Sequence, residues 1–429
     1  MIYHNIHFTG AGGVGVSGLA HIALDLGCDI TASDAADSAV LQLLREHVAE
    51  RLGDADRRVV VGHTSLPEAT ELLVYSSAVP ESDPERAEAT ARDIPQMRRG
   101  DFLNLLALEF PVRIAVSGSH GKTTTSSMIA HILQRCGMNP GYMIGGSVNG
   151  WSRSASRGGG QYFVSEVDES DGSQAGFPST IAIVLNIDDD HCWGLGGTRA
   201  LERCFIELGL RSRHLLTWRS ETTERLFGEW RKAIFVDTPT KAIHLPGLHN
   251  RTNAAVAIKA CEMLGVNATD AIAALNDYPG VSRRMSERAR SADGAHILVE
   301  DYAHHPTELD ATLSALREAY PDKRLLVVFQ PHRIERVERY GARFAELLSK
   351  TDWCGVVEPF AAWRTDGRTA DVKSMIADKV TPPCPVVANS PEDIANLAAH
   401  EWLDGSPAVL AVIGAGDVTH AVAALQKLI

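Results

Sequence analysis

The amino-acid sequence predicts an α/β protein made of three successive domains, each built around a largely parallel sheet. Its 429 residues exceed what one ordinary hydrophobic core encloses. Short apolar runs alternate with helical patterns along the chain, as they do where helices join parallel strands. Each of three segments also opens with a strand that leads into a glycine turn or a polar motif. We therefore expect domains over residues 1–109, 110–280 and 281–429.

The first segment runs from an apolar stretch through a glycine-rich turn into a helical pattern. In order, we expect strands at residues 6–8, 29–34 and 72–77 and a helix at residues 17–24. Gly10, Gly12 and Gly15 fit the spacing of a dinucleotide-binding turn. Asp34 lies near the position where an acid meets a ribose hydroxyl. Because any pyrophosphate can bind at a helix N-terminus, the turn indicates a diphosphate more securely than NAD. A nicotinamide-dependent oxidoreductase remains the alternative.

The second segment carries a glycine-rich loop, residues 118–121, between a predicted strand and a predicted helix at residues 124–133. Lys122 and Thr123 follow the loop directly. Its backbone N–H groups and the helix dipole can hold phosphate oxygens, while the lysine adds charge and the threonine hydroxyl reaches a magnesium ion. The common phosphate-loop pattern has a glycine where this chain has Val116. An ordinary turn before a helix is therefore the alternative to a triphosphate site.

Two clusters of acidic residues follow apolar runs in the second segment, at residues 166–171 and 186–191. Carboxylate oxygens suit Mg²⁺, but a phosphate site uses only one or two of them, so several of these acids belong to turns. For either cluster alone, solvated strand ends are an equal alternative. The preceding phosphate loop favours a metal site, and we select Glu166 and His191 as its ligands.

Polar side chains also mark the region where the second segment ends and the third begins. His249, Asn250 and Asn253 stand at a predicted helix start, where they can bind a purine or a ribose. A plain helix cap is the alternative, because asparagine caps helices well. Residues 301–308 contain an acid and two histidines that could hold zinc, but their spacing matches no common zinc pattern.

Arginines follow a later apolar run in the third segment. Arg333 and Arg336 offer guanidinium forks beside His332, and such forks suit a carboxylate. A solvated helix face is the alternative. Further along the chain we expect strands at residues 182–186, 297–299, 325–329 and 409–413, and a flexible, glycine-rich stretch at residues 152–160.

The composition of the chain restricts the kinds of partner and cofactor that it can have. The net charge of -13 argues against nucleic acid or an acidic membrane as the main partner, because both favour basic surfaces. The seven cysteines form no C-x-x-C pair, so neither a zinc knuckle nor a disulfide framework is indicated. Residues 1–10 show no basic region followed by an apolar stretch, and no apolar run approaches the length of about 20 residues that spans a membrane, so we expect neither secretion nor membrane insertion. We expect a cytoplasmic enzyme.

Taken together, these motifs resemble the Mur ligases, the ATP-dependent amide-forming enzymes of cell-wall precursor synthesis. The likeness covers the chain nearly end to end and is carried by residues 10–20, 75–80, 118–125, 166–171, 189–191, 249–250, 301–308, 329–333 and 414–417. It implies a Rossmann-like N-terminal domain that binds a UDP group and a P-loop ATPase-type central domain that binds ATP. It also implies a Rossmann-like C-terminal domain that carries the amino acid.

The resemblance implies a two-step reaction. A substrate carboxylate attacks the γ-phosphate of ATP, and an amine then attacks the acyl phosphate. L-Alanine and the lactyl carboxylate of UDP-N-acetylmuramate are the expected substrates, with ATP and Mg²⁺ as cofactors. Alternatives are a recycled peptide or another amino acid or acid, the nicotinamide-dependent enzyme, and a catalytically silent descendant. We expect small-molecule partners only, and a monomer or homodimer.

The resemblance also assigns roles to residues. Catalytic roles fall to Lys122, Glu166 and His191, and metal binding to Thr123, Glu166 and His191. The implied ATP-binding residues are Gly118, Ser119, His120, Gly121, Lys122, Thr123, Thr124, His249, Asn250, Asn253, Arg284 and Asp301. The implied UDP-binding residues are Gly12, Gly13, Val14, Gly15, Asp34, Ser76 and Ser77. The implied ligands of the amino-acid carboxylate are His332, Arg333 and Arg336.

The chain departs from the family pattern in its middle. The family usually shows an aspartate and a tyrosine shortly after His191, where this chain has Cys192 and Trp193, and the segment up to Gly247 is short. These departures leave the added amino acid or peptide open. We expect Lys122→Ala to abolish turnover while leaving the fold intact.

Overall fold

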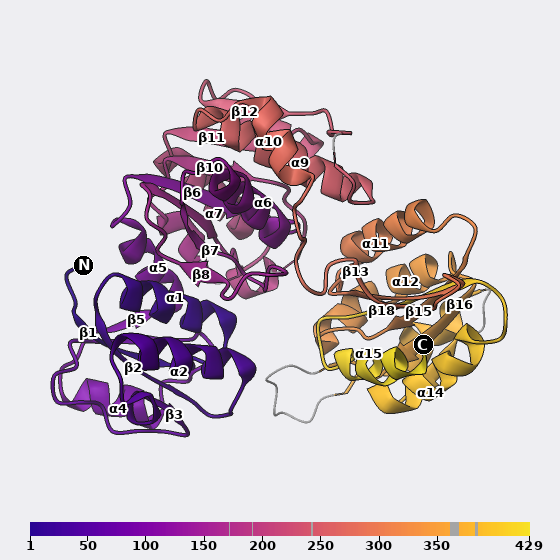
Figure 1. Cartoon of the computed structure of the whole chain (residues 1–429), viewed down its shortest axis with the longest axis horizontal. Helices are drawn as coiled ribbons and strands as arrows, with labels where there is room; N and C mark the ends of the chain where they lie inside the picture. Colours follow the sequence, from indigo (N-terminus) through magenta and orange to yellow (C-terminus); the bar gives the residue numbers. More distant parts are fainter. Residues whose placement is uncertain (171, 191, 242, 361–368, 382–384) are drawn as a thin grey trace. The chain divides into compact units, whose positions relative to one another are not determined.

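The computed structural model describes residues 1–429 except 171, 191, 242, 361–368 and 382–384. The described strands form three separate sheets, each flanked by helices (Figure 1). By its internal contacts the chain divides into two compact units, residues 1–243 with 252–279 and residues 244–251 with 280–429. The predicted α/β architecture with three domains is confirmed. The domain boundaries after residues 109 and 280 stay predictions.

The N-terminal sheet has five parallel strands in the order β3-β2-β1-β4-β5. Its strands are β1 (Asn5–Thr9), β2 (Asp29–Asp34), β3 (Val59–Val61), β4 (Leu72–Tyr75) and β5 (Gln96–Arg98). Its helices are α1 (Val14–Asp25), α2 (Ala39–Arg51), α3 (Ala55–Arg58), α4 (Pro84–Ala91) and α5 (Arg99–Ala107). Strand order reverses at β1, and ligands bind at the carboxyl edge of such a reversal. The glycine turn after β1 occupies that place.

The middle sheet has the order β12-β11-β10-β6-β9-β7-β8 and is parallel except for β8. Its strands are β6 (Val112–Ser117), β7 (Gly141–Met143), β8 (Ala155–Ser156), β9 (Tyr162–Glu166), β10 (Ile181–Val184), β11 (His214–Trp218) and β12 (Ala233–Val236). Its helices are α6 (Lys122–Arg135), η1 (Ser173–Gly176), η2 (Cys192–Leu195), α7 (Thr198–Arg211), α8 (Glu221–Phe227), α9 (Leu248–Met263) and α10 (Ala268–Leu275). Because β6 lies between β10 and β9, the ends of these strands surround the loop before α6.

The glycine-rich stretch at residues 152–160 is not the flexible segment that its composition predicts. It contains β8, which pairs with β7. The N–H groups of Gly159 and Gly160 donate to the carbonyl of Asn139 at 3.2 and 2.7 Å. A Cβ on Gly158 would lie 2.3 Å from the carbonyl oxygen of Pro140, so this glycine allows two backbone segments to approach closely. The prediction of a flexible segment was wrong.

The C-terminal sheet has the order β13-β14-β18-β15-β16-β17, with only β13 antiparallel among its strands. Its strands are β13 (Ser286–Arg290), β14 (His296–Asp301), β15 (Arg324–Phe329), β16 (Trp353–Val357), β17 (Val386–Ala388) and β18 (Ala408–Ile413). Its helices are α11 (Pro306–Ala319), α12 (Ile334–Leu348), α13 (Val372–Met375), η3 (Ala377–Lys379), α14 (Pro391–Trp402), α15 (Thr419–Leu425) and η4 (Gln426–Leu428). The carboxyl ends of β14, β18 and β15 are neighbours, which brings three sequence-distant motifs together.

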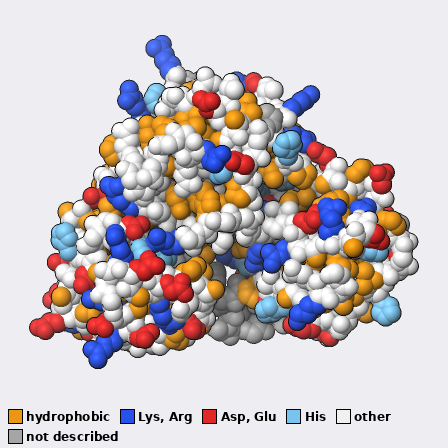
Figure 2. Space-filling model, viewed as in Figure 1, with side chains coloured by type: hydrophobic (Ala, Val, Ile, Leu, Met, Phe, Trp, Pro, Cys, Tyr) orange, Lys and Arg blue, Asp and Glu red, His pale blue; other side chains and the backbone are white. Residues whose placement is uncertain are grey.

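The predicted strands and the two predicted helices are present. β4 and β10 end two residues earlier than expected, at Tyr75 and Val184. Among the described residues, no helix is both long and apolar enough to cross a membrane. On the face drawn in Figure 2, basic and acidic side chains are interspersed.

Candidate active site

The glycine turn of the N-terminal domain is held by the end of β2. The N–H groups of Gly10 and Ala11 both donate to the carbonyl of Ser33, at 2.9 Å each. The N–H of Gly12 donates to Asp34 Oδ2 at 2.7 Å, and Asp34 Oδ1 accepts from the N–H of Ala36 at 3.0 Å. A bound diphosphate at this turn would therefore meet a loop whose shape Asp34 already fixes.

The remaining predicted UDP-binding residues border the same turn. Ser76 follows β4, and a Cβ on Gly10 would lie 3.0 Å from the Cβ of Ser76. Ser77 is exposed beside it. Gly13 caps α1, and Val14 and Gly15 form its first turn, where the helix dipole favours an anion. The structure thus brings the predicted set together at one edge of the sheet.

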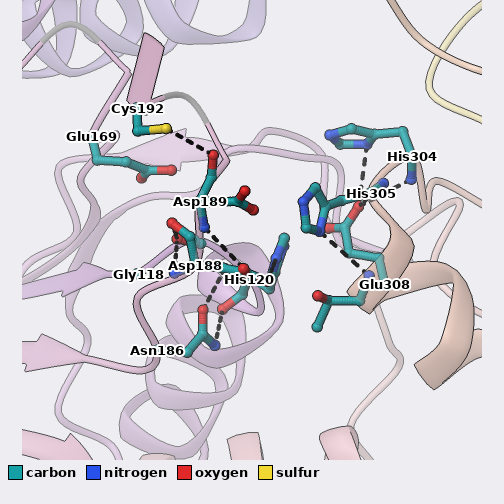
Figure 3. A network of polar contacts seen from close by, with 12 residues as sticks. Gly118, His120, Glu169, Asn186, Asp188, Asp189, Cys192, His304, His305 and Glu308 are labelled. Carbon is teal, nitrogen blue, oxygen red and sulfur yellow. Dashed lines mark hydrogen bonds and ion pairs between the residues drawn. The ribbon is translucent and has the colours of Figure 1, made fainter. Parts of the chain in front are cut away.

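The phosphate loop before α6 has the backbone that its glycines predict. Gly118 and Gly121 have φ of 136° and 83°, values that other residues rarely adopt. Asn186, just beyond β10, braces the loop: its Oδ1 accepts from the N–H of His120 at 2.8 Å and its Nδ2 donates to the carbonyl of His120 at 3.0 Å (Figure 3). The carbonyl of Asn186 also accepts from the N–H of Ser119 at 3.1 Å.

The side chains of the loop are tied to the same segment. Ser119 Oγ accepts from the N–H of Asp188 at 2.9 Å, and His120 Nε2 lies 3.1 Å from Asp188 Oδ2. Asn253, from α9, packs on the loop as well, because a Cβ on Gly121 would lie 2.7 Å from Asn253 Oδ1. This places Asn253 beside the phosphate loop, while its predicted contact with a purine or ribose stays a prediction.

Lys122, the first residue of α6, is surrounded by acceptors. Its Nζ donates to the carbonyl of Gly118 at 2.7 Å and lies 3.3 Å from that of Ser119. It also lies 2.8 and 3.0 Å from the two carboxylate oxygens of Glu169, whose side chain is fully buried. Glu169 is thus the anionic partner of Lys122.

The structure describes two of the three predicted metal ligands, Thr123 and Glu166. Thr123 lies in the first turn of α6, and Glu166 ends β9, the strand next to β6. Glu166 Oε2 accepts from the N–H of Gly145 at 2.8 Å. A hydroxyl and a carboxylate on neighbouring elements form a hard oxygen donor set, which fits Mg²⁺. His191 lies outside the described residues. Cys192 after it is buried, and its Sγ donates to the carbonyl of Asp189 at 3.0 Å.

In the second compact unit, several predicted nucleotide-binding residues brace their own domain. Asp301 is 4 % exposed, and its carboxylate accepts from the N–H groups of Met285 and Ala303 at 2.7 and 2.8 Å. Asn250 Nδ2 donates to the carbonyl of Pro246 at 2.7 Å. Their predicted contacts with adenosine stay predictions, as does that of His249. Burial, aided by the charge of Arg284, lowers the pKa of His249 to about 4.

The two histidines of residues 301–308 lie at the start of α11. His305 caps the helix by accepting from the N–H of Thr307 at 3.3 Å. Glu308 Oε2 accepts from the N–H of His304 at 3.0 Å and lies 3.3 Å from His304 Nδ1 (Figure 3). Arg284 lies 3.5 Å from the other oxygen of Glu308 and stacks over Tyr302. His305 and Glu308 thus form a capping box at the start of α11.

The predicted amino-acid ligands lie together where β15 leads into α12. His332 stacks on Phe360, with ring centroids 5.8 Å apart, and its Nδ1 accepts from Arg336 Nη1 at 3.2 Å. Arg336 is 1 % exposed, so the alternative of a solvated helix face was wrong for this residue. Arg333 has φ of 70° and ψ of 138°, a conformation rare for any residue except glycine. Such strain is often found at binding sites.

Sequence comparison gives the relationship of the whole chain. Residues 5–111 match the Mur ligase family catalytic domain, residues 116–213 the Mur ligase middle domain, and residues 283–425 the Mur ligase glutamate ligase domain. The chain is 32% identical to the UDP-N-acetylmuramate--L-alanine ligase of Coxiella burnetii, with 99% of this chain and 98% of the relative covered. The chain belongs to the Mur ligase family. It is therefore an ATP-dependent ligase, and the nicotinamide alternative is set aside.

Other relatives agree. This Mur ligase is 34% identical to the UDP-N-acetylmuramate--L-alanine ligase of Halorhodospira halophila over 96% of this chain and 91% of the relative. Its fold is similar to the UDP-N-acetylmuramate-alanine ligase of Thermotoga maritima, with a TM-score of 0.81, 24% identity and 99% and 98% coverage. It is also similar to a murein peptide ligase from Psychrobacter arcticus, with a TM-score of 0.66, 21% identity and the same coverage. These structures show a shared fold.

The electrostatics of the loop favour a charged lysine in this Mur ligase. Burial alone would lower the pKa of Lys122, but the negative charges of Glu169, Asp168 and Glu166 hold that pKa above its usual range. Burial would raise the pKa of Asp168, but Lys122 and Arg99 hold it below its usual range. The ammonium and the Asp168 carboxylate are thus both ionised at neutral pH.

Sequence reasoning missed three residues that the structure places at the loop: Asn186 as its brace, Glu169 as the partner of Lys122, and Arg99 as the partner of Asp168. Asn186 and Glu169 lie in acidic clusters whose positions were predicted, but the spacing does not say which side chain turns inward. Arg99 comes from α5, and no local pattern links it to residue 168.

Proposed function

We propose that this Mur ligase joins L-alanine to the lactyl carboxylate of UDP-N-acetylmuramate, using ATP to activate the carboxylate. The observation that carries the proposal is a glycine loop at the start of α6, with Lys122 half-buried at its centre, in a chain that aligns over almost its full length with two alanine ligases. We further propose that the reaction takes place in the cytoplasm.

The phosphate loop would bind the β- and γ-phosphates of ATP. Asn186 fixes the N–H groups of the loop, so these groups would not need to reorganise during the reaction. A preorganised site stabilises developing charge in this way. Lys122 would turn from Glu169 to the transferring phosphoryl group and neutralise its developing charge. Thr123, Glu166 and His191 would hold Mg²⁺, which supplies charge neutralisation at the phosphate oxygens when bound.

The two carboxylates of the reaction would bind at different domains. The turn at residues 10–15 would hold the diphosphate of the UDP-linked acid and so direct its lactyl carboxylate toward the γ-phosphate. Arg333 would receive the carboxylate of alanine, while Arg336 orients His332. Exclusion of water would protect the acyl phosphate until the amine attacks it.

The experiment that tests the proposal is phosphate release from ATP and Mg²⁺ in the presence of UDP-N-acetylmuramate. The amino acids are offered singly, a murein tripeptide is offered in a separate reaction, and each product is identified by its mass. We expect release that depends on L-alanine and on the UDP-linked acid. If phosphate is released with the tripeptide and with none of the amino acids, the chain is a peptide ligase. If no acceptor that is offered causes phosphate release, the proposal is overturned.

A further inference from the structure

Arg99 is the first residue of α5 and follows β5 directly. It therefore stands at the carboxyl edge of the N-terminal sheet, the edge that also carries the glycine turn after β1. Its side chain keeps 25% of its surface exposed. None of the roles assigned above to UDP, ATP or the amino acid uses this arginine.

On one side, the guanidinium of Arg99 covers the first turn of α1. A Cβ placed on Gly15 would lie 3.2 Å from Arg99 Nη1 and 3.5 Å from its Cδ. Contacts of 3.2 Å are tighter than ordinary side-chain packing, so any larger residue at position 15 would displace the arginine. The last glycine of the turn thus gives room for a cation at the helix N-terminus, where a diphosphate is favoured.

On the other side, Arg99 contacts the segment after β9. Its Nη2 donates to Asp168 Oδ2 at 2.6 Å. Asp168 is itself fixed, because its Oδ1 accepts from the N–H of Ser170 at 3.0 Å and its Oδ2 accepts from Ser170 Oγ at 2.8 Å. The next residue, Glu169, holds the ammonium of Lys122. One guanidinium therefore touches both the start of α1 and the segment that holds the phosphate-loop lysine.

We propose that Arg99 binds the diphosphate of the UDP-linked substrate at the start of α1 and, by holding Asp168 at the same time, couples that site to the ATP site. The inference rests on the proposed function, since it takes the diphosphate as the ligand of the glycine turn. A planar guanidinium can bind two anions through different edges, whereas a lysine ammonium acts as a single point charge.

The coupling has a required sign. When the diphosphate shares the charge of Arg99, the hold of the arginine on Asp168 weakens, and the neighbouring Glu169 yields Lys122 more readily to ATP. Linkage then demands that ATP strengthen the binding of the UDP-linked acid by the same factor. Loss of Arg99 removes a substrate contact and the coupling together, while loss of the Asp168 charge removes only the coupling.

The test is calorimetric titration of the full-length chain with UDP-N-acetylmuramate, with and without Mg²⁺ and a non-hydrolysable ATP analogue. We expect the analogue to strengthen binding in the unmodified chain. Arg99→Ala should weaken binding at least tenfold without the analogue and abolish its effect. Asp168→Asn should bind normally without the analogue and show no strengthening with it. Arg99→Lys should recover part of the affinity but none of the coupling.

The control is Arg225→Ala, which removes an arginine that donates to Glu202 at the same distance of 2.6 Å on the surface of the middle domain. This variant should match the unmodified chain. Unchanged affinity and coupling in Arg99→Lys, or in a folded Arg99→Ala, would overturn the inference. If the unmodified chain turned over UDP-N-acetylmuramate, that result would leave the proposed function standing. Failure of the unmodified chain to bind this substrate would overturn both.

Discussion

The Asp34 carboxylate accepts a hydrogen bond from the backbone N–H of Gly12 at 2.7 Å. A Cβ on Gly12 would lie only 2.7 Å from the carboxylate carbon, so the contact requires glycine at this position. The sequence predicted that Asp34 meets a ribose. The structure shows a second role for Asp34, because its carboxylate holds the backbone of the glycine turn in place.

Asp34→Ala should therefore impair the UDP site without touching the ATP site. We expect the KM for UDP-N-acetylmuramate to rise at least tenfold and the KM for ATP to stay within a factor of two. The lost hydrogen bonds should also lower the free energy of unfolding by about 1–3 kcal/mol. Steady-state kinetics with each substrate varied in turn, and urea unfolding, check the two effects. Equal rises in both KM values would contradict the assignment.

Removal of Lys122 should stop turnover, and the structure indicates that it should also lower the stability of the fold. Glu169 is fully buried and has the lysine as its cationic partner, and burial raises the pKa of Glu169 to about 7, so Lys122→Ala leaves a buried carboxyl that must take up a proton to lose its charge. Breaking such a pair costs about 3–5 kcal/mol. We still expect the fold to stay intact, at a cost in stability that comes from Glu169.

The matched variant replaces both members of the pair, as Lys122→Met with Glu169→Leu. We expect urea unfolding to show that the double variant is more stable than Lys122→Ala, because no buried carboxyl without a partner remains. Phosphate release should be absent in both. Normal turnover of Lys122→Ala would remove the basis of the proposed ATP site.

Two substitutions of Arg333 can distinguish the effect of its strained backbone on stability from the effect of its guanidinium on substrate binding. Its φ of 70° favours glycine, so Arg333→Gly should be more stable than Arg333→Ala by about 1 kcal/mol, the reverse of the usual order. Both variants lack the guanidinium and should raise the KM for L-alanine far more than that for ATP. Chemical denaturation compares the stabilities. Equal effects on the two KM values would refute the proposed contact with alanine.

The acid stability of the first compact unit should depend on His21. This buried ring lies with its Nδ1 2.9 Å from His47 Nδ1, and Arg153 Nη1 donates to the same atom of His47 at 2.6 Å. Burial, with the charges of His47 and Arg153, lowers the pKa of His21 to about 3, although Asp25 opposes the shift. Between pH 6.5 and 3 the unfolded chain thus binds a proton that the folded chain does not.

Stability should consequently fall as pH falls through this window, by about 1.4 kcal/mol per pH unit from this group. His21→Phe keeps an aromatic ring and cannot be protonated, so its unfolding free energy should change less steeply with pH. His4→Gln, at an exposed position, is the control and should keep the original slope. Identical slopes for all three proteins would show that His21 does not control acid unfolding.

Much of this fold could be predicted because its signals are local. The strand, glycine loop and helix around Lys122 follow one another in sequence, and the buried runs that form β14, β15 and β18 are continuous. β13, by contrast, has the polar sequence Ser-Glu-Arg-Ala-Arg and becomes a strand only because β14 offers it an edge. Tertiary pairing of this kind leaves no local pattern.

The site was predictable in its location and less so in its contacts. The carboxyl ends of parallel strands meet at one edge, so the acids after β9 and β10 were expected near the phosphate loop. Which acid faces the lysine depends on the turn after Glu166, where strand alternation no longer applies. Arg336 could not be placed either, because the periodicity of α12 does not show that Arg336 packs against His332.

The contacts of Lys122 would affect both the binding of ATP and the release of ADP in the proposed site. An ammonium group has three protons, and the protein already offers them four acceptors within 3.3 Å. In the proposed ATP site, binding would be an exchange of partners in which a phosphate replaces Glu169, so only the difference between two anions would contribute to affinity. The same carboxylate would compete for the lysine once the γ-phosphate has been transferred. In the proposed cycle this competition would favour the release of ADP.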